Sequence, residues 1–183
     1  MEVAEKLWNL SWKMWLSLEN IFKMVFGNAK CTSTARLDGK TAIVTGSNTG
    51  IGKYTVQDFY RRGARVIMAC RNVEKAEEAA KDIQKACEGE ENLGEILVLQ
   101  LDLSSLESVR QFAKEILEKE DRVDLLINNA GIMLCPEGKT VDGYETQFGT
   151  NHLAHFLLTL LLMPKIIKSA PARIVTVSSI GHT

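Results

Sequence analysis

The chain has 183 residues, of which 45% are hydrophobic and 25% are charged. These values are typical of a soluble domain that is long enough to bury a hydrophobic core. The formal net charge is −1, which provides no basic field, so no nucleic-acid partner is expected. The four cysteines are far apart and the three histidines add no metal-ligand spacing. We therefore expect free thiols in a reducing compartment and no metal site.

Residues 1–27 have the pattern of an amphipathic helix. At about 100° per residue, apolar side chains such as Leu7, Met14 and Leu18 share one face and polar side chains gather on the other. Charged residues, among them Lys13, interrupt the run of about 20 apolar residues that a membrane-spanning helix needs. The pattern predicts a helix that lies in a membrane surface. The alternative is a helix that packs its apolar face on the protein's own body.

The globular domain is expected over residues 38–183, after a polar linker at 28–37, and opens with a strand, a glycine-rich turn and a helix. Thr41–Thr45 is an apolar, β-branched run of the kind that parallel sheets bury on both faces, and Tyr54–Arg62 has helical spacing. The turn between them contains Gly46, Ser47, Asn48, Thr49, Gly50, Ile51 and Gly52. Such a turn binds phosphate groups, because the first N–H groups of the helix face the anion and glycine permits close approach. The alternative is that the glycines serve only the packing of a tight turn.

The end of the second predicted strand, Ala64–Cys70, indicates which dinucleotide the site prefers. In dinucleotide folds an acidic residue at this place binds the ribose 2′-hydroxyl, whereas an arginine accommodates a 2′-phosphate. Here Arg71 and Asn72 follow the strand, and no carboxylate precedes Glu74. Because a guanidinium forms charge-assisted hydrogen bonds with phosphate, the sequence favours NADP(H) over NAD(H). The alternative is that Arg71 is a solvated residue at the start of the helix Val73–Cys87.

The third predicted strand, Ile96–Leu101, is followed by Asp102 and Leu103. Ser104 and Glu107 have the spacing of a capping box and predict the start of the next helix, which continues to Glu118. The fourth predicted strand, residues 123–127, ends in Asn128, Asn129, Ala130 and Gly131. Polar residues at the carboxyl end of a buried strand lie where open α/β sheets bind ligands. The alternative is a turn closed by asparagine side chains.

The last third of the chain combines a long helix with a fifth strand. After a loop at residues 135–144, Gln147–Met163 is so apolar that we expect a helix buried on most sides. Pro171 marks the next break, and Arg173–Val177 predicts a strand that leads to Ser178 and Ser179.

Three of these motifs resemble those of the short-chain dehydrogenase/reductase family. Thr-Gly-x-x-x-Gly-Ile-Gly at 45–52 resembles its cofactor loop, and Asn-Asn-Ala-Gly at 128–131 resembles its second hallmark. Asn-His-Leu-Ala-His-Phe at 151–156 is similar to the Asn-His-Leu-Gly-His-Phe signature of the retinol-dehydrogenase-like branch, with Ala154 in place of the glycine. The resemblance covers residues 37–183. It implies an α/β fold, a Rossmann-type doubly wound parallel sheet with strands in the order 3-2-1-4-5-6-7.

The resemblance also implies roles for individual residues. Asp102 would lie beside the adenine ring, although it reads equally well as a loop or cap residue. Asn151 would belong to the catalytic tetrad and organise a water molecule, and Ser179 would stabilise charge on the substrate's carbonyl oxygen. His152 and His155 are expected to be structural. The cofactor loop and the second hallmark contribute the remaining binding residues, including Asn129, Ala130 and Gly131.

The family's general acid/base is a tyrosine in Tyr-x-x-x-Lys, downstream of this serine. None of Tyr54, Tyr60 and Tyr144 has a lysine four residues later. We therefore expect the 183 residues to be part of a longer enzyme, truncated after the fifth strand, whose last strand lacks a neighbour. The predicted function is NADP(H)-dependent hydride transfer on a lipophilic alcohol or carbonyl such as a retinoid; the alternative is a dinucleotide-binding fragment without turnover. A membrane-surface location, at the endoplasmic reticulum or alternatively the mitochondrion, and a homo-oligomer complete the expectations.

Overall fold

The computed structural model describes residues 31–179. The predicted amphipathic helix at 1–27 and the first residues of the predicted linker lie outside this range. In the described part, Ala35 onwards belongs to one compact unit.

The centre of that unit is a parallel sheet whose strands are ordered β3-β2-β1-β4-β5. The strands are β1 (Thr41–Thr45), β2 (Arg65–Cys70), β3 (Glu95–Gln100), β4 (Leu125–Asn128) and β5 (Arg173–Thr176). Ile43 of β1 lies opposite Ile67 of β2 and Leu126 of β4. The predicted doubly wound sheet and its strand order are therefore confirmed for the five strands.

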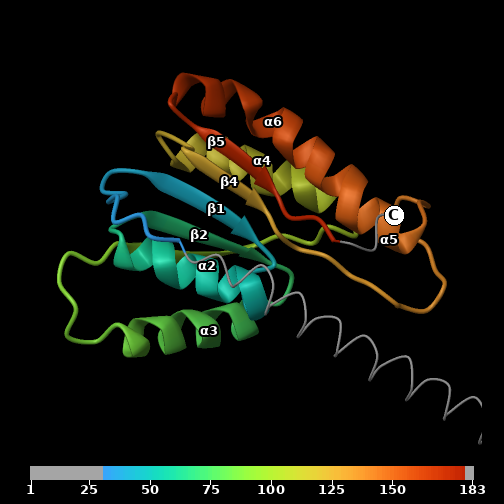
Figure 1. Ribbon diagram of the computed structural model, residues 1–183. Helices are drawn as coiled ribbons and strands as arrows, with labels where there is room; N and C mark the ends of the chain where they lie inside the picture. Colours follow the sequence, from blue (N-terminus) through green and yellow to red (C-terminus); the bar gives the residue numbers. More distant parts are fainter. Residues whose placement is uncertain (1–30, 180–183) are drawn as a thin grey trace, which may run out of the picture. The chain divides into compact units, whose positions relative to one another are not determined.

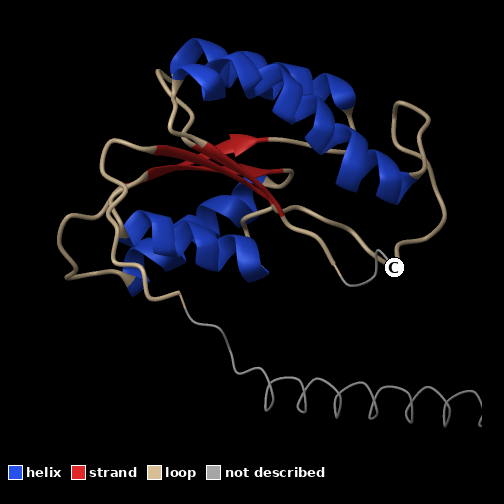
Figure 2. Ribbon diagram, turned by 45° about the horizontal axis from the view of Figure 1, so that its top comes forward, coloured by secondary structure: helices blue, strands red, loops and turns tan. Residues whose placement is uncertain are grey.

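Two layers of helices cover the two faces of the sheet (Figures 1 and 2). One layer holds α2 (Gly50–Arg61) and α3 (Val73–Ala86), and the other holds α4 (Leu106–Lys119) and α6 (Ala154–Lys168). Side chains alternate between the faces of a strand, so Val44 packs in the cluster with α2 and α3, whereas Ile43 packs with α4 and α6. All five residues of β1 are buried, as its apolar sequence predicts.

Two helices begin elsewhere than the sequence predicts. α2 starts at Gly50 instead of Tyr54. Gly50 and Gly52 occupy its first turn, and glycine is a poor former of a helix interior, so the sequence places the start too late. The capping box at Ser104 is wrong: the cap of α4 is Ser105, whose Oγ accepts a hydrogen bond from the Ser108 amide at 3.3 Å. Ser104 instead donates to Asp102 in the preceding turn.

The long apolar helix is interrupted near its start. It runs as α5 (Thr146–Phe148), a π-helical turn η1 (Gly149–Leu153) and α6, and it passes through Pro164. The expectation that this helix is buried on most sides is wrong for the described fold: Leu158 and Leu162 are fully buried, but Leu160 is 51% exposed and Ile167 is 66% exposed. One face packs on α4 and the sheet, and the opposite face carries these exposed side chains.

β5 lies at one edge of the sheet and pairs with β4. All four of its residues are exposed, with Ile174 at 38% and Val175 at 44%. Within the described residues no strand pairs with its other side.

Candidate nucleotide-binding site

A cavity of about 500 Å³ opens at the carboxyl ends of the strands, toward which the arrowheads point in Figure 1. The loops after β1, β2, β3 and β4 all contribute to its wall. The lining residues are Gly46, Asn48, Thr49, Ala69, Arg71, Asn72, Lys75, Leu101, Asp102, Leu103, Ser104, Asn129, Ala130, Gly131, Ile132, Thr146 and Thr150. The structure thus brings together four of the predicted motifs at one edge of the sheet.

Glycine is required at two positions of the turn after β1. Gly46 has φ +61°, and a Cβ there would lie 2.7 Å from the Cβ of Ala130. At Gly52 a Cβ would lie 2.8 Å from the Cα of Ser47. Gly46 therefore permits the loop after β4 to approach, and Gly52 permits α2 to pack on the turn. Ser47 itself is buried and donates a hydrogen bond to the carbonyl of Val44 at 3.0 Å.

The first turn of α2 has no side-chain cap. Thr49 is the N-cap residue and makes no side-chain hydrogen bond to the helix, whereas Asn72 caps α3 and Ser105 caps α4. No acidic residue stands in this turn. Gly50, Ile51 and Gly52 belong to it but do not line the cavity. Because this turn has neither a side-chain cap nor an acidic residue, its backbone N–H groups, at the positive end of the helix dipole, can receive an anion.

Two cationic side chains line the cavity beyond β2. Arg71 was predicted there, and it is exposed. Lys75 was not predicted, although its place in the first turn of α3 is a signal that could have found it. Asn72 lines the cavity too, but its Oδ1 accepts from the Lys75 amide at 2.7 Å and so caps α3. The wall here attracts anions.

Asp102 both lines the cavity and shapes its own turn. Its Oδ1 accepts hydrogen bonds from the Ser104 amide at 2.9 Å and from the Ser104 hydroxyl at 2.7 Å. Leu103 next to it is buried and contributes an apolar part of the wall. The loop role that the sequence allowed for Asp102 is therefore present, together with its position at the cavity.

The loop after β4 is fixed to the end of β1. The Thr45 hydroxyl accepts hydrogen bonds from the amides of Asn129 at 2.9 Å and Ala130 at 3.0 Å. The Asn129 side chain also donates to the Thr45 carbonyl at 2.8 Å. Gly131 continues this loop along the cavity wall.

The two residues to which the resemblance gives catalytic roles lie outside the cavity wall. Asn151, in η1, is held by Ile132: its Oδ1 accepts from the Ile132 amide at 2.9 Å and its Nδ2 donates to the Ile132 carbonyl at 2.8 Å. It contributes to a second, smaller pocket of about 240 Å³ that His155 also lines. Ser179 is exposed and lines neither pocket.

One residue of the cavity wall, Thr150, has a buried hydroxyl without a hydrogen-bond partner. Thr150 is 9% exposed and lines the cavity, and its Oγ1 has no hydrogen-bond partner. A buried hydroxyl left unpaired is costly, so a polar ligand in the cavity would stabilise this residue. Thr150 and Thr146 belong to the wall although no sequence motif indicated them.

Among residues 31–179, no group of histidine, cysteine or acidic side chains is arranged to hold a metal ion. In the same residues no helix has both the length and the apolarity needed to cross a bilayer.

Known proteins share both the sequence and the arrangement. The sequence model of the short chain dehydrogenase family matches residues 40–182. This chain belongs to the short-chain dehydrogenase family. It is 55% identical to retinol dehydrogenase 13 of Homo sapiens over 152 residues, which are 83% of this chain and 45% of that protein. It is 51% identical to retinol dehydrogenase 11 of Mus musculus over 176 residues, which are 96% of this chain and 54% of that protein. The chain thus spans about half the length of these relatives.

Solved structures are also similar to this chain in fold and in sequence. A metagenomic short-chain oxidoreductase in complex with NADP matches with a TM-score of 0.67 and 30% identity, over 79% of this chain and 64% of that one. The RhlG/NADP active-site complex of Pseudomonas aeruginosa matches with a TM-score of 0.66 and 31% identity, over 79% of this chain and 56% of that one.

Proposed function

We propose that this chain binds NADP(H) in the 500 Å³ cavity and belongs to an oxidoreductase that transfers hydride between the nicotinamide and a lipophilic alcohol or carbonyl compound. The proposal rests on three features seen together: the first turn of α2 has no side-chain cap, Gly46 allows the loop after β4 to approach the turn after β1, and Arg71 and Lys75 line the cavity beyond β2. Each feature suits a different part of a phosphorylated dinucleotide.

The pyrophosphate would bind at the start of α2. The amides of Gly50 and Ile51 stand at the positive end of the helix, where fixed dipoles favour negative charge. Gly46, at φ +61°, lacks the Cβ that would meet Ala130, so the turn after β1 and the loop after β4 can lie together at the cavity wall. The Thr150 hydroxyl, buried and unpaired, supplies a polar partner elsewhere in the wall.

The preference for NADP(H) over NAD(H) rests on Arg71 and Lys75. Both line the cavity beyond β2, where a 2′-phosphate would lie. The acidic residue in the same wall, Asp102, directs its Oδ1 to Ser104. A 2′-phosphate would therefore meet two cations, and charge-assisted hydrogen bonds to them would strengthen its binding. The two NADP-complexed structures similar to this chain support the same choice.

The catalytic part of the proposal concerns Asn151 and Ser179. Asn151 would organise the proton relay, held in place by Ile132, and Ser179 would stabilise charge on the substrate oxygen. The named relatives are retinol dehydrogenases, which supports a lipophilic alcohol or aldehyde such as a retinoid. Attachment to a membrane surface through residues 1–27, at the endoplasmic reticulum or the mitochondrion, would suit such a substrate.

A second candidate function is dinucleotide binding without turnover by these 183 residues. The observation that favours it is that none of the three tyrosines precedes a lysine by four positions, and none lines the cavity. A homo-oligomer is compatible with either candidate.

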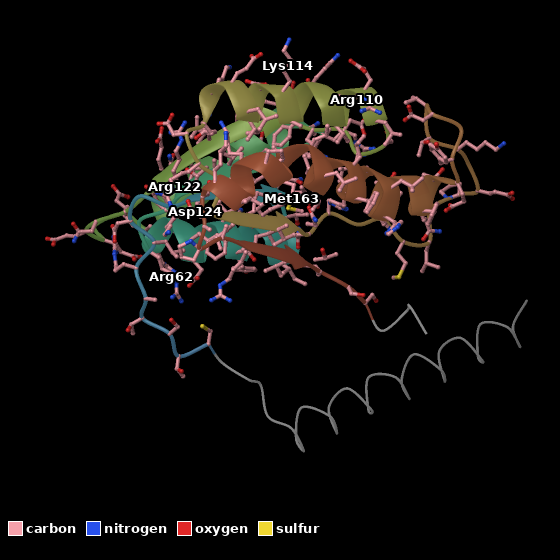
Figure 3. The ribbon with its side chains drawn as sticks, turned by 90° about the horizontal axis from the view of Figure 1, so that it is seen from above. Arg62, Arg110, Lys114, Arg122, Asp124 and Met163 are labelled. Atoms are coloured by element: carbon pink, nitrogen blue, oxygen red, sulfur yellow. The ribbon has the colours of Figure 1, made fainter. Side chains whose placement is uncertain are left out.

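The test compares NADPH and NADH binding by calorimetry, using the full chain, a double variant and a matched control. Arg71→Ala/Lys75→Ala removes the two cavity cations, whereas Arg110→Ala/Lys114→Ala removes the same charge from the exposed face of α4 (Figure 3). We expect NADPH to bind about tenfold or more tightly than NADH, because charged hydrogen bonds contribute about 1.5–3 kcal/mol. The cavity variant should lose this preference and the α4 variant should keep it.

Equal affinity for both nucleotides in the unmodified chain would contradict the NADP(H) preference, and absence of binding would contradict the site. Reduction of retinal by NADPH, with the retinol that forms measured by chromatography, separates the two candidate functions. Turnover supports the oxidoreductase for this chain, and binding without turnover supports the second candidate.

A further inference from the structure

His155 is a buried imidazole that joins the cavity wall to the π-helical turn. It is 4% exposed, and both ring nitrogens have partners. Nε2 lies 2.9 Å from the Thr45 hydroxyl, and Nδ1 lies 2.9 Å from the carbonyl oxygen of Asn151. From the sequence this histidine is expected to be structural, because no second ligand or base stands at a spacing that would pair with it.

The partners fix where the ring carries its proton. A carbonyl oxygen can only accept, so Nδ1 must carry a hydrogen and donate to Asn151. A hydroxyl has one hydrogen and two acceptor positions, and the amides of Asn129 and Ala130 occupy both acceptor positions of Thr45. The Thr45 hydrogen must therefore be donated, and the nearest acceptor is Nε2, since the Ile127 carbonyl is 3.5 Å away. All these bonds are satisfied when the ring is neutral.

We propose that His155 is a positioning residue of the nucleotide site, which orients the Thr45 hydroxyl through Nε2 and the Asn151 carbonyl through Nδ1. By accepting the hydroxyl hydrogen, the ring turns the oxygen of Thr45 toward the amides after β4. Those amides belong to Asn129 and Ala130, which line the cavity. This inference rests on the proposed NADP(H) binding at that cavity.

His152, three residues earlier, differs from His155 in its surroundings. His152 is exposed, and its ring stacks between Phe148 and Phe156 with centroid distances of 5.3 and 6.2 Å. Within residues 31–179, no hydrogen bond joins the His152 ring to Thr45, whereas one joins the His155 ring to it. His152→Leu is therefore a matched control for His155→Leu.

The first experiment measures NADPH affinity in variants that keep different parts of the ring. His155→Leu, which removes both hydrogen bonds, should weaken NADPH binding about tenfold, because the Thr45 hydroxyl loses its acceptor. His155→Gln places a carbonyl oxygen near the position of Nε2 and should bind within about threefold of the unmodified chain. His155→Asn keeps a donor near Nδ1 only and should resemble His155→Leu. His152→Leu should bind within about twofold.

A double-mutant cycle distinguishes positioning from a general loss of packing. If His155 acts through Thr45, adding His155→Leu to Thr45→Val should weaken NADPH binding no further. Equal losses in both backgrounds, or failure of His155→Gln to restore affinity, would overturn the proposal.

The ring tautomer is measured on the unmodified chain by ¹⁵N NMR and does not depend on nucleotide binding. We expect the hydrogen of His155 on Nδ1 and a neutral ring at pH 7. A ring with its hydrogen on Nε2 would overturn the proposal even if NADPH binds. If NADPH does not bind at all, the proposed function fails, and the tautomer together with the amide shifts of Asn129 and Ala130 in His155→Leu and His155→Gln still decides this inference.

Discussion

The two ends of the parallel sheet are built from different chemistry. At the amino ends of the strands, the side chain of Asp124 is 2% exposed and ionically paired with Lys40 and Arg122 (Figure 3). It also accepts a hydrogen bond from the Thr41 amide at 3.0 Å. At the carboxyl ends, the corresponding cluster consists of the neutral groups of Thr45, His155 and the loop after β4.

Under the proposed function, the amino end of the sheet contributes to stability and the carboxyl end to binding. The charge of Asp124 is neutralised by its neighbours and joins the start of β1 to the start of β4. At the other end, neutral side chains shape the wall and leave the dipole of α2 and the cations Arg71 and Lys75 available to a ligand. The charged side chains at the amino end pair with one another, whereas Arg71 and Lys75 at the carboxyl end line the cavity.

The largest expected effect is on stability, at the amino end. Asp124→Ala leaves Lys40, Arg122 and the Thr41 amide without their carboxylate, so we expect the free energy of unfolding to fall by about 3 kcal/mol. Urea unfolding measures it. Asp82→Asn, which affects an exposed pair with Lys53, should cost less than about 1 kcal/mol. Equal losses in the two variants would remove the distinction between the ends.

The next effect is on binding, at the carboxyl end. Gly46→Ala places a methyl group 2.7 Å from the Ala130 Cβ at a positive φ, so the cavity wall must move and NADPH affinity should fall about tenfold or more. Gly39→Ala is the control: its φ is +69°, but a Cβ there meets open space. It should cost about 1 kcal/mol of stability and leave NADPH affinity within about twofold. A large loss of affinity in Gly39→Ala would contradict the assignment.

The smallest effect is a difference in pH dependence between the ends. Burial lowers the pKa of His155 below its usual value of 6.5, although the Asn151 carbonyl partly opposes this. The unfolded chain therefore binds the proton more readily, and the stabilisation is complete above pH 6.5 and lost as the pH falls through the folded pKa. His155→Gln should make the free energy of unfolding less dependent on pH below pH 6.5, the usual pKa of the imidazole.

Asp124 responds at lower pH. Burial raises its pKa, but hydrogen bonds from Arg122, the Thr41 amide and Lys40 outweigh burial and hold the pKa below 3.8. Its stabilisation is present above pH 3.8 and is lost as the pH falls through the folded value. Asp124→Asn should therefore lower the free energy of unfolding above about pH 4 and remove the loss of stability that the unmodified chain shows below about pH 4. An altered pH dependence near about pH 6 in this variant would contradict the assignment to Asp124.

The strands could be predicted because buried parallel strands are continuous apolar runs, whereas their order was implied by the resemblance to the short-chain dehydrogenase/reductase family. β1 has the predicted bounds, and the start of β5 is also as predicted. The start of α2 could not be predicted, since glycine disfavours helix interiors but is tolerated in a first turn. The glycine-rich turn and the loop after β4 were recognised from local motifs.

The rest of the site depends on contacts between distant segments. Thr146 and Thr150 reach the cavity only because α5 and η1 are placed beside it. The π-helical turn at Asn151 and the bond from His155 to Thr45, 110 residues away in sequence, leave no periodic signal in the sequence. Residue spacing along the chain therefore predicts the motifs, whereas the other side chains of the site are known only once the tertiary structure is known.

If the carboxyl end of the sheet binds NADP(H) and the amino end does not, an NMR titration of the ¹⁵N-labelled chain with NADPH will show it. We expect the amide signals of Gly50, Ile51, Ala130 and Gly131 to shift, while those of Thr41 and Asp124 stay in place. Shifts confined to the amino end, or no shifts at saturating NADPH, would contradict it.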